Sequence, residues 1–146
     1  MDTIPPQEIT LWRRLCDAYE SVREQLDRDL AALADLSLSE FDVLRILNDA
    51  GGSLRMSELA EQAHASRSGL TRRVDRLERR NLVRRERVDD DRRGLKAVLT
   101  QAGERLCQEL TPKYVDSLKS SALVRLNDQE MSSIVGMLER IRGPLS

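Results

Sequence analysis

Two short helical patterns, separated by a tight turn, stand directly before two strand-like runs, and this order limits the folds open to the chain. The helical patterns cover residues 58–63 and 66–80. The strand-like runs cover residues 82–88 and 95–99, and the polar linker 89–94 ends in glycine, which is typical of a β-hairpin. A helix-turn-helix followed at once by a hairpin predicts a winged helix-turn-helix lobe.

The second of these helices has one apolar and one polar side. At about 100° per residue, Leu70, Val74 and Leu77 form the apolar side. The opposite side carries the hydroxyl and charged groups of Ser68, Arg72, Asp75 and Arg79, with Thr71 on its shoulder. Hydroxyls bond phosphates or bases, and arginine suits the acceptor edge of guanine. Since this helix enters the major groove in winged lobes, we expect its polar side to face DNA.

Positive charge is concentrated in the same part of the chain. Residues 66–96 hold twelve Arg and Lys against six Asp and Glu, a net charge of +6, while the rest of the chain carries −7. A concentrated basic segment in a nearly neutral chain indicates a local polyanion site. An ordinary solvated helix with a basic outer face is the alternative, and the arginines of the hairpin argue against it.

The hairpin tip and the helix start add candidate DNA contacts. An arginine at a protruding tip, here Arg92 or Arg93, reaches into a neighbouring minor groove. The acidic residues 89–91 would orient these arginines through salt bridges, with an unrelated acidic turn as the alternative. Ser66 and the free amides of the first turn predict a phosphate-binding helix N-terminus, and Gly69 permits close approach of the backbone to DNA. The candidate DNA-binding residues are Ser66, Arg67, Ser68, Gly69, Thr71, Arg72, Arg73, Arg76, Arg92 and Arg93, and the strand leading to the tip carries Arg84, Arg85 and Arg87.

Long amphipathic helices are predicted on both sides of this lobe. Over residues 7–33, apolar side chains spaced three or four apart form a face longer than one small core needs. Thr100 is expected to cap another helix, which Pro112 should kink or interrupt. Asn127 and Glu130 resemble the capping box of a last helix. The long apolar faces indicate a surface for a partner chain.

Between the first helix and the helix-turn-helix, the pattern predicts one more short helix. Ser39 is its expected N-cap, and Gly51 and Gly52 end it. Residues 53–56 are too few for more than a single-bridge strand, and Ser57 is the expected start of the next helix.

These patterns together predict a mainly α-helical fold with a small β-wing. Residues 37–99 form the winged helix-turn-helix DNA-binding lobe, and residues 1–36 and 100–146 form a helical dimerisation domain from the two ends of the chain.

The chain resembles the multiple-antibiotic-resistance regulator (MarR) family. The resemblance is carried by Leu59-Ala60, Ser66–Glu78, Leu82–Arg85, Asp91–Arg93, Val98–Thr100 and Gly103. The blocks TR-VDRLE, DDRR and LT-x-x-G occur in the family's order and spacing, and the similarity extends over nearly the whole chain. The family usually has glycine where Asn81 stands, and asparagine also tolerates the left-handed conformation that ends a helix.

The resemblance implies a cytoplasmic transcriptional regulator that acts as a homodimer. Its N- and C-terminal helices would interlock, and its two recognition helices would meet successive major grooves of a palindromic operator in double-stranded DNA. Members of the family usually repress nearby genes, and many release DNA when a small anionic or phenolic ligand binds. The ligand crevice of the family lies between the dimerisation helices and the DNA-binding lobe.

Few residues stand out as contacts for such an effector. Trp12 and Tyr19 on the first helix are candidates to line the crevice, with Arg13 or His64 to hold an anion. Packing at a dimer interface is the alternative for Trp12 and Tyr19. His64 also suits a helix boundary or a phosphate contact better than a metal, because no further ligands cluster with it.

The two cysteines, Cys16 and Cys107, have no metal-type spacing, and reduced thiols are expected for both. Peroxide-sensing members of the resembled family carry a reactive cysteine early in the first helix, so a thiol sensor at Cys16 is an alternative. Asp17 beside it would raise a thiol pKa, and Cys16 borders the apolar face, so a structural cysteine is the ordinary interpretation.

Other function classes lack support in the sequence. With one histidine, no glycine-rich phosphate loop and no clustered ligands, no enzyme active site, cofactor or metal is expected. No signal peptide or membrane span is apparent. A winged protein-interaction adaptor without DNA binding is the remaining alternative, and it would show acidic or apolar residues on the polar side of residues 66–80.

Overall fold

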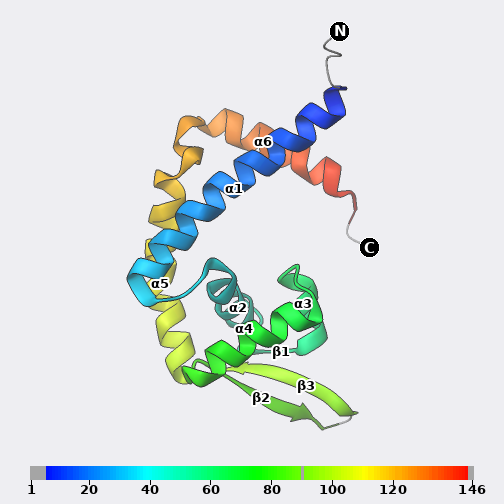
Figure 1. Cartoon of the computed structure of the whole chain (residues 1–146), viewed down its shortest axis with the longest axis vertical. Helices are drawn as coiled ribbons and strands as arrows, with labels where there is room; N and C mark the ends of the chain where they lie inside the picture. Colours follow the sequence, from blue (N-terminus) through cyan, green and yellow to red (C-terminus); the bar gives the residue numbers. More distant parts are fainter. Residues whose placement is uncertain (1–5, 90, 145–146) are drawn as a thin grey trace.

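The computed structural model describes residues 6–89 and 91–144, without the side chains of residues 91–93. The chain forms a helical arm and a lobe that carries a small sheet (Figure 1). The arm contains α1 (Gln7–Ala34), α5 (Gln101–Ser120), the 3-10 helix η1 (Ala122–Arg125) and α6 (Asp128–Arg142). The lobe contains α2 (Leu38–Asp49), β1 (Ser53–Arg55), α3 (Met56–Gln62), α4 (Arg67–Arg79), β2 (Val83–Val88) and β3 (Asp91–Leu99). The expected fold class, mainly α-helical with a small β-wing, is confirmed.

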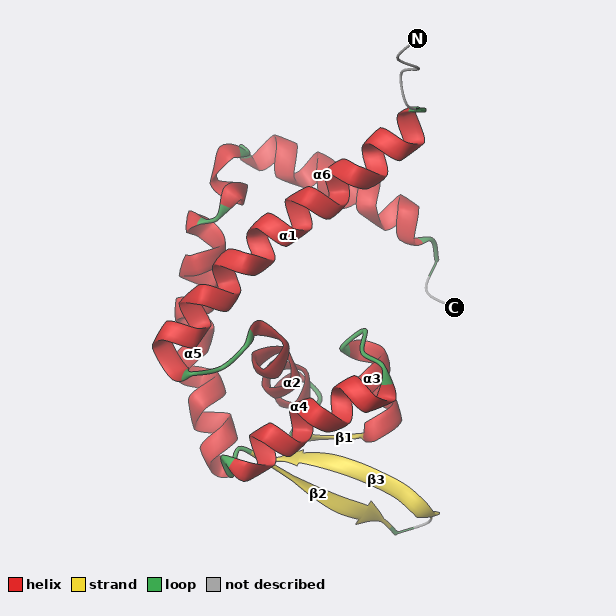
Figure 2. Ribbon diagram, in the orientation of Figure 1, coloured by secondary structure: helices red, strands yellow, loops and turns green. Residues whose placement is uncertain are grey.

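The three strands form one antiparallel sheet in the order β1-β3-β2, at the end of the molecule away from α6 (Figure 2). β1 pairs with β3 over all three of its residues, from Ser53 opposite Val98 to Arg55 opposite Lys96. The expectation of a single bridge was therefore wrong. Because β3 pairs with β1 on one side and with β2 on the other, the β2–β3 hairpin is joined to the rest of the lobe through β1.

The hairpin of β2 and β3 is longer than the sequence pattern indicated. β3 begins at Asp91 rather than at Leu95, because the arginines that follow Asp91 continue the extended backbone despite their polarity. The register shifts between Arg87 and Val88, close to the tip. Such irregularities increase the local twist of a hairpin and reorient its end.

Two helix starts differ from the sequence prediction. α2 is capped by Ser37 and not by Ser39, since Ser37 Oγ accepts from the amide of Glu40 at 3.0 Å and Glu40 Oε2 accepts from the amide of Ser37 at 3.1 Å. The Ser-x-x-Glu spacing permits this reciprocal pair, which Ser39 cannot form with Glu40. α3 begins at Met56 and not after Ser57, with Glu58 accepting from the amide of Arg55 at 3.3 Å.

The hydrophobic core lies inside the lobe and continues into the near half of the arm. Leu70, Val74 and Leu77, the expected apolar side of α4, are fully buried. They pack with buried residues of α2, α3 and the sheet, among them Phe41, Val43, Leu44, Leu47, Leu59, Val83 and Ala97. Leu30 of α1 and Leu110 of α5 join the same cluster. At about 1.5–3 kcal/mol for each fully buried large apolar side chain, this cluster fixes α4 on the lobe.

The far half of the arm, by contrast, leaves its apolar side chains exposed. α6 contains no buried residue, and in α1 only Leu26 and Leu30 are buried. The exposed large apolar residues of the arm are Ile9, Leu11, Trp12, Tyr19, Leu33, Val115, Leu123, Val124, Met131, Ile134, Val135, Met137, Leu138 and Ile141. α5 continues through Pro112 without the break that the sequence allowed.

Candidate nucleic-acid interface

The N-terminus of α4 is capped by its own sequence. Ser66 Oγ accepts from the amide of Gly69 at 3.0 Å and lies 3.4 Å from Ser68 Oγ. A Cβ on Gly69 would lie 2.9 Å from Ser66 Oγ, so the glycine leaves room for the cap. The first turn of α4 contains no acidic residue, and the positive end of the helix dipole is not neutralised by its own helix.

One side of α4 is open to solvent and carries cations and hydroxyls. We call the exposed residues Ser68, Thr71, Arg72 and Arg79 the exposed stripe, and Arg67 lies beside it at the helix start. Within the described part of the chain, no hydrogen bond or ion pair is recorded for the side chains of Arg67, Arg72 or Arg79. Three unpaired guanidinium groups on one helix are suited to bind phosphates or base edges.

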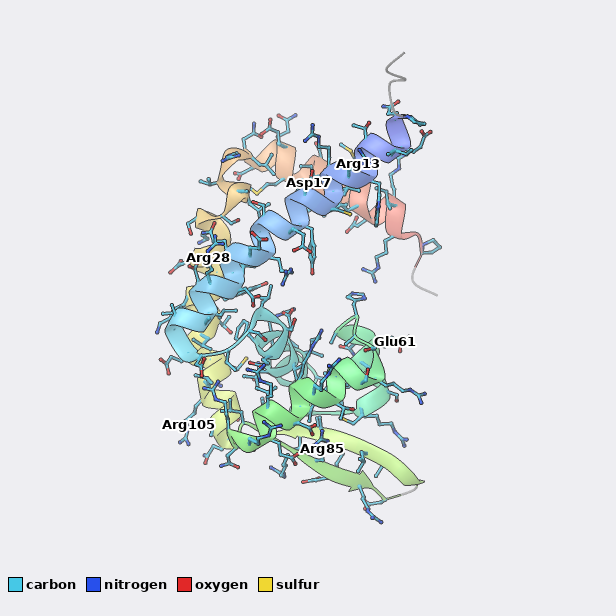
Figure 3. All side chains as sticks on the ribbon, viewed as in Figure 1. Arg13, Asp17, Arg28, Glu61, Arg85 and Arg105 are labelled. Carbon is cyan, nitrogen blue, oxygen red and sulfur yellow. The ribbon has the colours of Figure 1, made fainter. Side chains whose placement is uncertain are left out.

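Arg85 of β2 connects the wing to α4. Its Nη2 lies 2.5 Å from Asp75 Oδ1, its Nη1 pairs with Glu78, and its side chain is only 20% exposed. Nη2 also donates to the carbonyl of Thr71 at 3.3 Å. Figure 3 shows Arg85 between the strands and the helix. From the sequence, Arg85 was expected only on the approach to the tip. Its two-residue spacing from the buried Val83, which places both residues on the inner face of β2, was the signal that could have revealed this role.

The pairing of Arg85 offsets part of the negative charge of α4. Asp75, expected on the polar side of the helix, is held by Arg85 and is half-buried. Glu78 is held by the same guanidinium. The exposed stripe itself holds only hydroxyls and arginines, so its net charge is positive.

Two further candidate DNA contacts lie near acidic residues of α2, although the Arg76 side chain remains 66% exposed. Arg76 Nε lies 2.9 Å from Glu40 Oε1, and the Glu40 side chain is 5% exposed. Arg73 is half-buried near Asp42: burial raises the pKa of Asp42, and the charges of Arg45 and Arg73 oppose that rise. Arg73 and Arg76 are therefore not part of the exposed stripe.

The wing carries its own charges. Arg84 Nε lies 2.8 Å from Glu86 Oε1, and Lys96 Nζ lies 3.4 Å from Glu86 Oε2. Hydrogen bonds from Arg84 and Lys96 hold the pKa of Glu86 below its usual range. The backbone of Arg92 and Arg93 belongs to β3, whereas their side chains lie outside the described residues, as does the expected orientation of these arginines by the acidic residues 89–91.

A groove runs between α3, α4 and the hairpin. It has a volume of about 620 Å³ and is lined by Arg55, Met56, Ser57, Ala60, Arg67, Leu70, Thr71, Asp75, Arg85, Gly94 and Leu95. The groove meets the exposed stripe at Thr71. Arg67 and Thr71 of α4 line the groove together with Arg85, Gly94 and Leu95 of the hairpin, so the groove lies between the helix and the wing.

The four candidate effector contacts lie on α1 and in the turn between α3 and α4. Trp12 and Tyr19 are 68% and 64% exposed on α1, and Arg13 is exposed on the same helix (Figure 3). His64 is exposed in the turn between α3 and α4, with φ 48°. A second pocket of about 380 Å³ lies where α1 meets the lobe, lined by Asp27, Arg28, Ala31, Asp35, Leu36, Ser37 and Arg76. Neither this pocket nor the groove contains any of the four residues.

The cysteines are separate from these surfaces. Cys107 is buried, and burial raises the pKa of its thiol, while Cys16 is half-buried on α1. In the ranges 6–89 and 91–144, no group of histidine, cysteine and acidic side chains is arranged to hold a metal. None of the described helices is long and apolar enough to cross a bilayer.

Comparisons with known proteins agree with this geometry. The model of the MarR family matches residues 36–95, which include the whole helix-turn-helix and most of the wing. The transcriptional regulator YfiV of Bacillus subtilis is 34% identical over 100 residues, covering 68% of this chain and 61% of YfiV.

Solved structures also match nearly the whole chain, and two of them serve as examples. AbsC, a MarR family transcriptional regulator from Streptomyces coelicolor, is 30% identical with a TM-score of 0.85, covering 97% of this chain and 96% of AbsC. Sco3205, a MarR family regulator from the same organism, was solved in complex with DNA; it is 29% identical with a TM-score of 0.86, covering 97% of this chain and 89% of Sco3205.

Proposed function

This chain belongs to the MarR family of DNA-binding transcriptional regulators, and from that membership we propose that it represses transcription as a homodimer bound to a palindromic operator. The expectation that it is not an enzyme is confirmed by the same relatives. The observation that carries the proposal is the exposed stripe of α4. This helix side has unpaired arginines and lies next to a wing that Arg85 holds against Asp75.

We assign the DNA contacts by position. Arg72 and Thr71, in the middle of the exposed stripe, read base edges in the major groove. Arg67 and Ser68, in the first turn of α4, bind phosphates together with the free amides of the helix start. Ser66 and Gly69 form the cap and support these contacts. Arg92 and Arg93 of the wing enter the adjacent minor groove.

A second copy of this chain covers the exposed apolar residues of the arm. α6 has no buried residue of its own, yet it presents Ile134, Val135, Leu138 and Ile141, of which Ile141 is 64% exposed. A monomer rarely leaves so continuous an apolar face in water. Trp12 and Tyr19 lie on the same arm, so dimer packing explains their exposure better than an effector site.

An effector would act at the point where α1 meets the lobe. The pocket of about 380 Å³ at this point is large enough for a small molecule, and Arg28 in its wall has no recorded partner within residues 6–89 and 91–144. We propose that a small anionic or phenolic ligand binds here and releases the DNA. Salicylate is a suitable probe: the proposal expects it to dissociate the DNA complex of the wild type and to have a weaker effect on Arg28→Ala.

The competing functions have less support. An adaptor without DNA binding would not need unpaired arginines along α4. A peroxide sensor requires a reactive thiol, and Cys16 lies half-buried on the apolar arm. Release of DNA by peroxide from the wild type, but not from Cys16→Ser, would establish the thiol sensor instead.

The decisive experiment is selection of bound duplexes from random DNA by the purified protein, with its mass in solution measured in parallel. The proposal expects a dimer and an inverted repeat whose half-sites lie about one helical turn apart. A stable monomer, or no enrichment of an inverted repeat even in dilute salt, contradicts it.

A further inference from the structure

The segment that follows the recognition helix α4 lies where the lobe joins the helical arm. The lobe is attached to the arm through two short connections, residues 35–37 after α1 and Thr100 before α5. Arg80 bonds the first connection, and Asn81 and Leu82 bond the second. The three consecutive residues Arg80, Asn81 and Leu82 therefore bond, between them, both connections between the lobe and the arm.

Arg80 joins the end of α4 to the end of α1. Its Nη1 donates to the carbonyl of Asp35 at 2.8 Å, and its Nη2 donates to the carbonyl of Ala34 at 2.9 Å. The last carbonyls of a helix have no partner within the helix, and Asp35 closes α1 in the left-handed conformation with φ 52°. Since the last turn of α1 contains no basic residue, Arg80 supplies the cation that the negative end of the helix dipole favours.

The second connection is held by the two residues that follow. Thr100 Oγ1 donates to the carbonyl of Asn81 at 2.7 Å, and the amide of Thr100 donates to the carbonyl of Leu82 at 3.1 Å. Asn81 turns the chain with φ 58°. A Cβ on Gly103 would lie 2.1 Å from the carbonyl oxygen of Leu82, so α5 begins in direct contact with this turn.

Arg80 supplies a direct link between α1 and α4. α1 packs mainly on α5 and α2, whereas α4 packs on α2, α3 and β2, so the two helices share little apolar contact. A guanidinium that donates from two nitrogens to two carbonyls restricts direction as well as distance, which a single ammonium group does not. The link therefore restrains the angle between the helix of the arm and the helix that reads DNA.

We propose that Arg80 is a positioning residue that sets the distance and rotation between the two recognition helices of the dimer. The inference rests on the proposed function, since it requires two lobes on one inverted repeat. Each base pair added between half-sites rotates the second half-site by about 35° and moves it along the axis. If the link between arm and lobe is stiff, the affinity of the dimer for DNA depends steeply on the half-site spacing. If the link is loosened, that dependence becomes weaker.

The test compares the dimeric wild type with Arg80→Met and Arg80→Lys. The probes are duplexes that carry the inverted repeat selected by the wild type, the same repeat with one or two base pairs added or removed between half-sites, and a duplex with one half-site scrambled. We expect the wild type to lose roughly tenfold in affinity for each altered spacing. Arg80→Met should bind the scrambled duplex as the wild type does, bind the intact repeat more weakly, and show a clearly flatter dependence on spacing.

Arg80→Lys, which keeps the charge but cannot donate from a planar pair of nitrogens, should also flatten the spacing profile. Arg105→Met removes an exposed arginine of α5 for which no bond is recorded in the described residues, and it should keep the wild-type profile. An unchanged spacing profile in both Arg80 variants, or an equal loss on intact and scrambled duplexes, overturns the inference. If Arg80→Met does not fold, the Arg80→Lys profile decides alone. Failure of the wild type to select an inverted repeat rejects the proposed function instead.

Discussion

Arg85 of the wing and Asp75 of the recognition helix form an ion pair with 2.5 Å between Nη2 and Oδ1. The two residues come from elements that both face DNA in winged lobes, and Glu78 completes the contact on the same guanidinium. The pairing has two effects: it holds the hairpin against α4, and its positive charge offsets one of the two carboxylate charges beside the exposed stripe.

Replacement of Arg85 by glutamine should impair both stability and DNA binding. The free energy of unfolding should fall by about 1–2 kcal/mol, because charged hydrogen bonds are lost while solvent screens the partly exposed carboxylates. DNA affinity should fall further, since Asp75 and Glu78 become free negative charges near phosphate. Urea denaturation and DNA titration measure the two effects. Arg84→Gln, which breaks only the exposed pair with Glu86, is the control. Equal losses of stability and of DNA affinity in both variants would contradict the proposed role of Arg85 in holding the wing on α4.

Arg72→Ala should relax sequence discrimination. Its side chain lies in the middle of the exposed stripe without a recorded partner among the described residues, so it is available to a base edge. We expect a loss of about 1–3 kcal/mol on the selected operator and a smaller loss on unrelated DNA. Binding to a set of single-base operator variants should show one position at which the mutant no longer discriminates. An operator affinity equal to that of Arg105→Ala would exclude Arg72 as a base contact.

Arg93→Ala should weaken binding without changing sequence preference. An arginine in the minor groove acts mainly through charge, so operator and unrelated duplexes should lose affinity by similar factors. The slope of log affinity against log salt should flatten by about one. Titrations at several salt concentrations measure this slope. A changed base preference with an unaltered slope would be incompatible with the assignment.

Gly103→Ala should destabilise the fold. The added Cβ would lie 2.1 Å from the carbonyl oxygen of Leu82, a backbone atom that is itself bonded by Thr100. Separating α5 from this turn should cost about 1–3 kcal/mol in the free energy of unfolding. Gln101→Ala, at an exposed position in the same turn, controls for helix propensity. A Gly103→Ala protein as stable as the wild type would show that α5 adjusts without cost.

Cys107 should resist alkylation in the native protein. Burial raises the pKa of its thiol, so the reactive thiolate is scarcer at neutral pH than in an exposed cysteine and increases only at higher pH. Mass spectrometry after treatment with iodoacetamide should find Cys107 modified only once the protein is denatured. Modification of native Cys107 at the rate seen in the denatured chain would contradict its burial.

The local pattern of the chain was sufficient to predict much of the fold. The order of helices and strands, the buried side of α4 and the cap at Ser66 all follow from spacing along one element, because periodicity reports which side of a helix or strand is apolar. The true cap of α2 was also accessible, since Ser37 and Glu40 have the spacing of a capping box.

The partners of the arginines depended on the tertiary structure. Spacing placed Arg73, Arg76 and Arg85 in a basic segment and did not distinguish them from Arg72. The fold brings Arg85 to Asp75, Arg76 to Glu40 and Arg80 to the end of α1. These contacts join residues far apart in the chain, and which acid or carbonyl lies opposite a given guanidinium is set by how the elements pack. Periodicity within one element contains no information on the distance between side chains of different elements. Only the folded chain therefore separates the arginines that pair with groups of the lobe and the arm from those that remain available to DNA.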